Sequence, residues 1–584
     1  MSRKKRLAGN GLFFEGRTTM KTMKKTLAAL LALALLLGLG SAALAVDPGT
    51  AAHFDFPIES QFGMNHRMLL EQDGTMTLTG KGELIGEMGG PLPEGVENDY
   101  GIVIRFKDFV KKIVISEGTT SIAEGAFRNY DRLKEAGIPS TVRSIFGEAF
   151  YRCASLERID LPAALTMLDG DAFNGCTSLT EVKLPDALTW LGHQAFIGCV
   201  NLREITGGKS LSHVGFNVFG DTAWMNAQPD GVVCFGTFAV GYKGGIPADG
   251  LVTVPEGVKY LTDSLFDGQT ELVGVTLPSS LETIGWFAFN QCGRLSDVRL
   301  PDGLKEIGES AFEACKALTE IRIPAGVKRI SRSAFAHTGL KTVTIEPGVQ
   351  EICDDAFSNC TALEEIDLPE GITVIGSSAF ALDKDLKRIA IPRSVKTIGN
   401  SAFYECEKME DVTIPEGVRE IEPRAFYHCA ALKTLKLPDS VETIQYALEN
   451  ITGLEEITLP ASLSSFGSLF TCRALKKIVF EGSEQEWAAL LAAEGTNVNM
   501  LNGIEVVIAG RPAATAETVG DVDADGQVTA ADARLVLRAA VDLQVFGLYS
   551  KDKADADRDG QITAADARKV LRAAVELEDR TSWL

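Results

Sequence analysis

The chain has 584 residues, of which 45% are hydrophobic and 23% are charged. These values are ordinary for globular proteins, and they exclude a wholly disordered chain, a collagen and a membrane protein with many spans. The formal net charge is -22, from 57 Lys and Arg against 79 Asp and Glu. A broad surface for nucleic acid requires an excess of cations, so nucleic acid is not expected as a partner. Eleven cysteines are too few for a disulfide scaffold in a chain of this length.

The amino-terminal segment has the features of an export signal. The long apolar run at residues 27–39 is too short to cross about 30 Å of hydrocarbon as a helix. Lysines precede this run and Ala-Leu-Ala follows it, so residues 1–45 are predicted to be a signal peptide, with the mature chain beginning at Val46. The signal is already complete from Met20, which makes this residue a candidate for the true start. We therefore expect a secreted, extracellular protein without membrane insertion.

Most of the chain repeats the template V/LxxIGxxAFxxCxxLxxIxLPxx. Fifteen starts can be aligned between Thr119 and Leu463, at steps of 22 or 23 residues with one step of 47. In LxxIxLP, the two apolar residues face one side of a short strand while the residue between them faces solvent. The recurring Phe of the AF pair is placed to stack between neighbouring turns. No single repeat can bury its apolar face, so the repeats must stack on one another.

This pattern resembles the BspA-type leucine-rich repeats of secreted and surface proteins, over about residues 100–482. The resemblance implies a mainly β leucine-rich-repeat solenoid of about 15 rungs of 22–23 residues. Residues 222–245, within the longer step, are similar to the hairpins that such arrays carry, which places an insertion at about 222–257. The strand-like segment after Asp73 and the segment around Trp487 resemble the caps of these arrays.

The polar residue in the middle of each strand is the candidate binding position of the solenoid. Long parallel sheets present rows of side chains to a partner, so we expect a surface that binds a protein or a glycan. The alternative is a plain structural spacer. The chemistry of the row is mixed, so no ligand class follows from it. The representative residues of this solenoid face are Asp160, Lys183, Arg299, Arg322, Asp367 and Lys436.

The cysteines and histidines do not form a recognisable catalytic or metal-binding pattern. Nine cysteines occupy the C of AFxxC, where buried free thiols are favoured over disulfides or metal ligands. The CxxC clustering of zinc sites is missing, as are HExxH, GxSxG and the P-loop. The sequence therefore predicts that the protein is not an enzyme. The nine residues are Cys153, Cys176, Cys199, Cys292, Cys315, Cys360, Cys406, Cys429 and Cys472.

Two near-identical acidic loops of twelve residues, 521–532 and 555–566, lie near the carboxyl terminus. Carboxylates at positions 1, 3, 5 and 12, a Gly at position 6 and a backbone carbonyl at position 7 suit one Ca²⁺ per loop. Two Ca²⁺ ions are therefore predicted. An amphipathic helix follows each loop. The predicted ligands are Asp521, Asp523, Asp525, Gln527 and Asp532 in the first loop, and Asp555, Asp557, Asp559, Gln561 and Asp566 in the second.

The duplicated loop and helix resemble a type I dockerin, over about residues 519–580. The resemblance implies a small all-α, calcium-binding module that binds a cohesin module of a scaffoldin. Loop positions 10 and 11 are both Ala in each half, where many dockerins carry hydroxyl residues, so the cohesin class is not assigned. The cohesin-binding residues implied by the resemblance are Ala530, Ala531, Arg534 and Arg538, or Ala564, Ala565, Arg568 and Arg572.

These predictions give a secreted, non-catalytic binding or adhesion protein, held in a cellulosome-like complex at the cell surface by non-covalent contacts. The solenoid would be the ligand-binding surface. A structural spacer and an accessory protein of carbohydrate degradation remain as alternatives. The predicted segments are a signal peptide (1–45), a β-rich cap (46–108), a solenoid (109–482), a second cap (483–510), a linker (511–518) and a dockerin (519–584).

Overall fold

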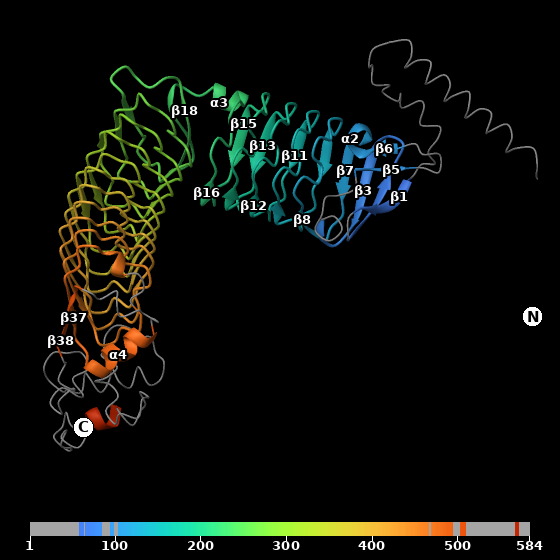
Figure 1. The fold of residues 1–584 in the computed structure, drawn as a ribbon. Helices are drawn as coiled ribbons and strands as arrows, with labels where there is room; N and C mark the ends of the chain where they lie inside the picture. Colours follow the sequence, from blue (N-terminus) through green and yellow to red (C-terminus); the bar gives the residue numbers. More distant parts are fainter. Residues whose placement is uncertain are drawn as a thin grey trace, which may run out of the picture.

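The structure is a computed structural model that describes residues 58–62, 65–84, 94–97, 103–465, 469–493, 503–509 and 567–571. It is a β-solenoid of about 16 turns with few helices, which confirms the predicted fold class. Figure 1 shows two arms that meet at a bend beside strand β18 (Phe238–Lys243).

The LxxIxLP part of each repeat forms a strand of what we call the long-strand sheet. In β13 (Glu181–Leu184) and β25 (Glu320–Ile323) exposed and buried residues alternate, as predicted for apolar residues two apart. Neighbouring turns pair in parallel one repeat apart, so that Glu181 lies opposite Glu204. The other strands of this series are β7 (Lys112–Ile115), β9 (Glu135–Gly137), β11 (Arg158–Asp160), β15 (Glu204–Gly207), β19 (Leu251–Thr253), β21 (Gly274–Thr276), β23 (Asp297–Val298), β27 (Thr342–Ile345), β29 (Glu365–Asp367), β31 (Arg388–Ala390), β33 (Asp411–Thr413), β35 (Thr434–Lys436), β36 (Glu456–Leu459) and β37 (Lys477–Phe480).

The xxI part of each repeat forms a second series, which we call the short-strand sheet. From β10 on, each strand has two residues, of which the second is buried. The strand ends there because the chain turns into the IGxxAF segment, in which one residue takes a positive φ. This series contains β8 (Thr119–Ile122), β10 (Ser144–Ile145), β12 (Met167–Leu168), β14 (Trp190–Leu191), β16 (His213–Val214), β20 (Tyr260–Leu261), β22 (Thr283–Ile284), β24 (Glu306–Ile307), β26 (Arg329–Ile330), β28 (Glu351–Ile352), β30 (Val374–Ile375), β32 (Thr397–Ile398) and β34 (Glu420–Ile421).

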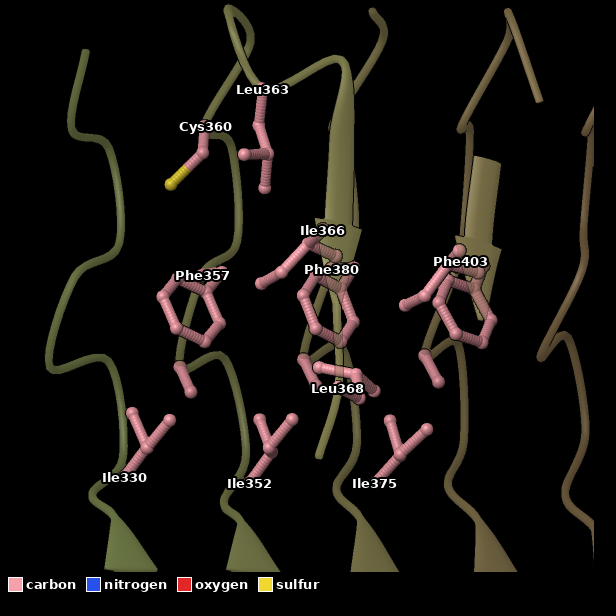
Figure 2. Close-up of a cluster of buried hydrophobic side chains, with 14 of the residues drawn as sticks. Ile330, Ile352, Phe357, Cys360, Leu363, Ile366, Leu368, Ile375, Phe380 and Phe403 are labelled. Atoms are coloured by element: carbon pink, nitrogen blue, oxygen red, sulfur yellow. The ribbon is translucent and has the colours of Figure 1, made fainter. Parts of the chain in front are cut away.

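A column of stacked phenylalanines runs through the interior of each arm. Phe150 and Phe173 have ring centroids 5.1 Å apart and planes 2° apart. Figure 2 shows the same register for Phe357, Phe380 and Phe403 in the second arm. These rings are fully buried, and each contributes on the order of 2 to 3 kcal/mol by the area removed from water. The predicted stacking of Phe between turns is confirmed.

The bend coincides with a division of the hydrophobic core. One cluster of buried residues runs from Met68 to Val240 and a second from Ala239 to Leu490. Between the arms, β17 (Gly231–Phe235) and β18 form an antiparallel hairpin, and β18 then pairs in parallel with β20. The short-strand sheet is interrupted between β16 and this hairpin. Because β18 takes a place of its own in the stack, the solenoid has more turns than the fifteen aligned repeats. Helix α3 (Ala223–Asn226) precedes the hairpin.

Other elements cover the two ends of the solenoid, where strand edges would otherwise be open. At one end, β3 continues an antiparallel meander and pairs in parallel with β7. At the other end, helix α4 buries Trp487 and Leu490, and β38 pairs with β37. These elements are β1 (Ile58–Phe62), β2 (His66–Leu70), β3 (Thr75–Gly80), β4 (Gly82–Leu84), β5 (Gly95–Glu97), β6 (Val103–Arg105), α2 (Phe106–Phe109), η3 (Leu469–Thr471), α4 (Glu484–Ala493) and β38 (Glu505–Ile508).

All nine cysteines of the AFxxC position are buried. Each thiol donates a hydrogen bond to a backbone carbonyl of the preceding turn; the distance from Cys153 Sγ to Phe127 O, for example, is 3.1 Å. The position therefore suits a small group that can both fill the turn and satisfy this carbonyl. Burial raises the pKa of the Cys292 thiol to about 12.

We expect most of the eleven thiols to be free in the folded protein. Burial raises the pKa of eight of the nine buried thiols, and all nine are already engaged with carbonyl oxygens, so they are poor nucleophiles for disulfide formation. Titration with a thiol reagent should find few reactive groups in the native protein and most of the eleven after denaturation without reductant. Fewer than half free after denaturation would indicate a solenoid held by disulfides.

Candidate functional site

The structure places all six residues of the predicted solenoid face at exposed positions of the long-strand sheet. Arg299 lies directly after β23, and the others lie within strands. The six are spread over both arms and do not converge on one point. The strands that carry them are β11 for Asp160, β13 for Lys183, β25 for Arg322, β29 for Asp367 and β35 for Lys436.

Two of the six, Asp160 and Lys183, lie together in a groove of about 620 Å³ over β11, β13 and β15. The groove is at an interruption of the long-strand sheet, since β11 ends one hydrogen-bonded sheet and β13 begins the next. Charged groups of both signs line it, beside the apolar edges of Leu161 and Pro185. Such a site can hold a polar ligand by hydrogen bonds and ion pairs of either sign. No group of three metal-ligating side chains occurs among the described residues, here or elsewhere.

Two other predicted residues already have partners within the protein. The guanidinium of Arg322 lies 2.8 Å from a carboxylate oxygen of Asp302 and 2.8 Å from one of Glu346. These hydrogen bonds raise the pKa of Arg322. The ammonium of Lys436 lies 2.8 Å from Glu481. These contacts link one turn to another, so Arg322 and Lys436 are less available to a ligand than Lys183.

Sequence reasoning missed part of the groove lining. Arg158, Glu181 and Glu204 are exposed at the first position of their strands, two residues before the row that the sequence singled out. The signal was present, because in a strand of alternating burial the first and third residues share the exposed side. Asp186 contributes from the turn after β13 and forms an ion pair of 2.9 Å with Lys209.

Of the predicted dockerin helices, the structure describes residues 567–571, which are helical. Ala567 and Val570 are buried, Arg568 is exposed, and Leu571 is 44% exposed. The predicted calcium ligands and the other predicted cohesin-binding residues lie outside the described residues.

The family comparison agrees with this architecture. The sequence profile of the BspA type leucine rich repeat region matches residues 106–225, 251–364, 329–446 and 373–488, which together exceed half of the chain. The chain belongs to the BspA-type leucine-rich-repeat family. The profile of the dockerin type I domain matches residues 519–573, so the chain also carries a type I dockerin at its carboxyl end.

Solved structures of bacterial leucine-rich-repeat proteins are similar to this BspA-type chain. One from Bacteroides ovatus is 25% identical, with a TM-score of 0.39, over 75% of this chain and 97% of the other. A leucine rich cell surface protein from Faecalibacterium prausnitzii is 19% identical, with a TM-score of 0.22, over 75% of this chain and 98% of the other. A leucine rich repeat protein from T. pallidum is 30% identical, with a TM-score of 0.26, over 33% of this chain and 82% of the other. No curated protein matches the chain.

The two modules indicate the general role of the chain. BspA-type repeats and dockerins are typically non-catalytic binding modules of extracellular or surface proteins. Repeats of this kind suggest protein binding, and a dockerin suggests attachment to a complex through a cohesin. Type I dockerins bind calcium. Within the described part of the chain, none of the helices is long and apolar enough to cross a membrane.

Proposed function

We propose that this BspA-type protein is a secreted, non-catalytic binding protein, held on a cohesin-bearing scaffoldin of a cellulosome-like complex by its calcium-loaded dockerin. The observation that carries the proposal is the pair of complete twelve-residue acidic loops, 521–532 and 555–566, at the end of a chain otherwise occupied by a solenoid and its caps. The export signal predicted at residues 1–45 fits an extracellular complex. Association with the cell surface is then non-covalent and occurs through the scaffoldin.

The solenoid is the ligand-binding part of this proposal, with a protein as the ligand that its repeats favour. The groove over β11, β13 and β15 supports binding over a spacer role, because a spacer requires no hollow lined by both signs of charge. An accessory role in carbohydrate degradation is the second candidate. It depends on a glycan binding to the solenoid face at Asp160 and Lys183.

Each dockerin loop is proposed to hold one Ca²⁺. Calcium loops of this type direct the carboxylates at positions 1, 3, 5 and 12 toward one ion, and without a cation their mutual repulsion opposes folding. In the first loop these carboxylates belong to Asp521, Asp523, Asp525 and Asp532. A cation that binds only the folded loop, at 100 times its dissociation constant, stabilises the module by about 2.7 kcal/mol per site. Calcium therefore controls whether the cohesin-binding helices are formed.

We expect a chelator to unfold the dockerin and abolish cohesin binding while the solenoid stays folded. Calorimetric titration of the full chain with each cohesin of its own genome, in calcium and in chelator, measures the binding. Far-ultraviolet circular dichroism reports the solenoid at the same time. Asp521→Ala with Asp555→Ala should mimic the chelator, whereas Asp160→Ala, on the solenoid, should not. Equal affinity in chelator, or no binding to any of the cohesins in calcium, would rule out the proposal.

A further inference from the structure

In two rows of exposed or half-buried side chains, aromatic residues occupy the turns near the bend. The first row is the first residue of each short strand, which is Ser144 in β10 and Glu306 in β24 but Trp190 in β14 and His213 in β16. The second row lies in the IGxxAF segment of each turn. Most turns have charged or small polar residues there, whereas the turns near the bend have His193, Phe216, Trp286 and Phe287. We call the combined surface the aromatic corner, formed by Trp190, His193, His213, Phe216, Trp286 and Phe287.

The rings of the first arm are stacked in pairs. Trp190 and His213 have centroids 3.7 Å apart and planes 13° apart. His193 and Phe216 have centroids 5.7 Å apart and planes 3° apart. In Figure 1, β12 and β16 lie on the side of the first arm that faces the space between the arms. Strand β16, which carries His213, therefore lies on the inner side of the bend.

Asp263 lies near residues of both arms at the aromatic corner. Its Oδ1 accepts a hydrogen bond of 2.8 Å from the backbone N–H of Trp286, in the next turn of its own arm. It is also within electrostatic reach of His213 and His193 of the other arm. Burial raises the pKa of Asp263, whereas this hydrogen bond and the two histidines act in the opposite direction. The corner is thus a largely aromatic surface with a partly buried carboxyl, Asp263, where the two arms meet. A second carboxyl, Asp171, has its Oδ2 3.5 Å from His193 Nε2.

The two rings of the second arm are partly exposed to solvent. Trp286 is 51% exposed and Phe287 is 41% exposed. Phe287 also has a φ of 56°, a conformation that is unfavourable for a bulky residue. The equivalent residue in the turns on either side is a serine, Ser264 or Ser310, also with a positive φ. A large apolar side chain that is both strained and exposed points to a contact with another molecule.

We infer that the aromatic corner is the docking site of a protein partner, whose projecting segment carries apolar side chains and a cation that faces Asp263. This inference rests on the proposed role of the solenoid as a ligand-binding surface. Exposed tryptophans are the residues that contribute most to protein interfaces. The net charge of -22 and the central carboxyl favour Lys or Arg on the partner.

The test uses the full chain in calcium and a phage-displayed library of random twelve-residue peptides as the probe. We expect the selected peptides to combine aromatic or aliphatic residues with Lys or Arg. Affinity for the synthesised peptides should fall at least tenfold in the double variant Trp286→Glu with Phe287→Ser. The variant Tyr446→Ser is the matched control, because Tyr446 has the same positive-φ position and is 54% exposed, but lies far along the second arm.

Folding of the variants can be checked directly. Phe287→Ser installs the residue found in the neighbouring turns, so its melting temperature should equal or exceed that of the unchanged protein. If the peptides instead lose affinity with Arg158→Glu and Lys183→Glu, the aromatic corner is not their docking site, although the solenoid is still a binding surface. If no peptide is selected, the aromatic corner as docking site and the solenoid as binding surface are both contradicted. If the protein binds a neutral oligosaccharide and the Trp286 and Phe287 variant does not, the partner is a glycan and the proposal of a protein partner is wrong.

Discussion

Replacing Asp383 by Cys is expected to stabilise the solenoid, and the gain should increase as the pH rises from 4 to 7. Asp383 occupies the AFxxC position of its turn and is fully buried. Its Oδ1 accepts a hydrogen bond of 2.7 Å from the backbone N–H of Cys360, but its Oδ2 has no partner among the described residues. A cysteine here would fill the turn and could donate to a carbonyl as the other ladder cysteines do, for example Cys406.

The direction of the pH effect follows from the protonation of Asp383. Burial raises the pKa of this carboxyl well above its ordinary value of 3.8. Above pH 3.8 the unfolded chain releases the proton while the folded chain keeps it, so ionisation favours unfolding. The loss of stability is about 1.4 kcal/mol per pH unit until the folded-state pKa is reached. The full contribution of Asp383 is therefore present at low pH and is lost as the pH rises from the unfolded-state pKa toward the folded-state pKa.

Denaturant unfolding of the unchanged protein and of Asp383→Cys at several pH values measures this difference. Other groups titrate alike in both proteins, so their effects cancel. Asp383→Thr is the matched control, since Thr338 fills the same position and its hydroxyl donates to Phe335 O at 2.8 Å. It should remove the pH dependence as Cys does. A stability difference that is the same at pH 4 and pH 7 would mean that the folded protein accommodates the ionised carboxylate.

The repeating part of the fold was predictable because its signals are local. Strands such as β13 follow from apolar residues two apart, and the stack of Phe150 on Phe173 follows from a constant period. The buried ladder of cysteines follows in the same way, since each turn places Cys153 and its equivalents against the turn before. A period of 22 or 23 residues brings equivalent positions together in every turn, so one template describes them all.

What the sequence did not predict lies where neighbouring turns differ. The interruption between β11 and β13, which hosts the groove, is not visible in the template that both turns share. To predict the aromatic corner, aligned positions would have to be compared between turns. The bend that brings Asp263 near His213 would also have to be known. Asp383 is one of several departures from the Cys of AFxxC, and its cost follows only from the burial of that position. Such departures from a repeat are where function and strain are most usefully sought.

The last prediction concerns the two proposed cohesin-binding faces of the dockerin. Residues 521–544 and 555–578 differ at six of 24 aligned positions, so each half carries the same Ala-Ala and Arg-Arg pattern. From this similarity we expect a half-turn of the module to exchange the two halves, so that either could contact the same cohesin surface. Two equivalent modes double the association constant relative to one, so removing one mode should cost about a factor of two in affinity.

We therefore expect Arg534→Glu with Arg538→Glu to change cohesin affinity little, and Arg568→Glu with Arg572→Glu to behave likewise. The quadruple variant should bind at least about 100-fold more weakly, because no face is left without repulsive charge. Arg568 is exposed, so its replacement need not disturb the packing of the helix. Calorimetric titration in calcium measures the three variants, and an unchanged calcium affinity shows that each is folded. Leu535 and Lys569 break the symmetry. If one double variant alone abolishes binding, these two residues select a single face and the symmetric mode is wrong.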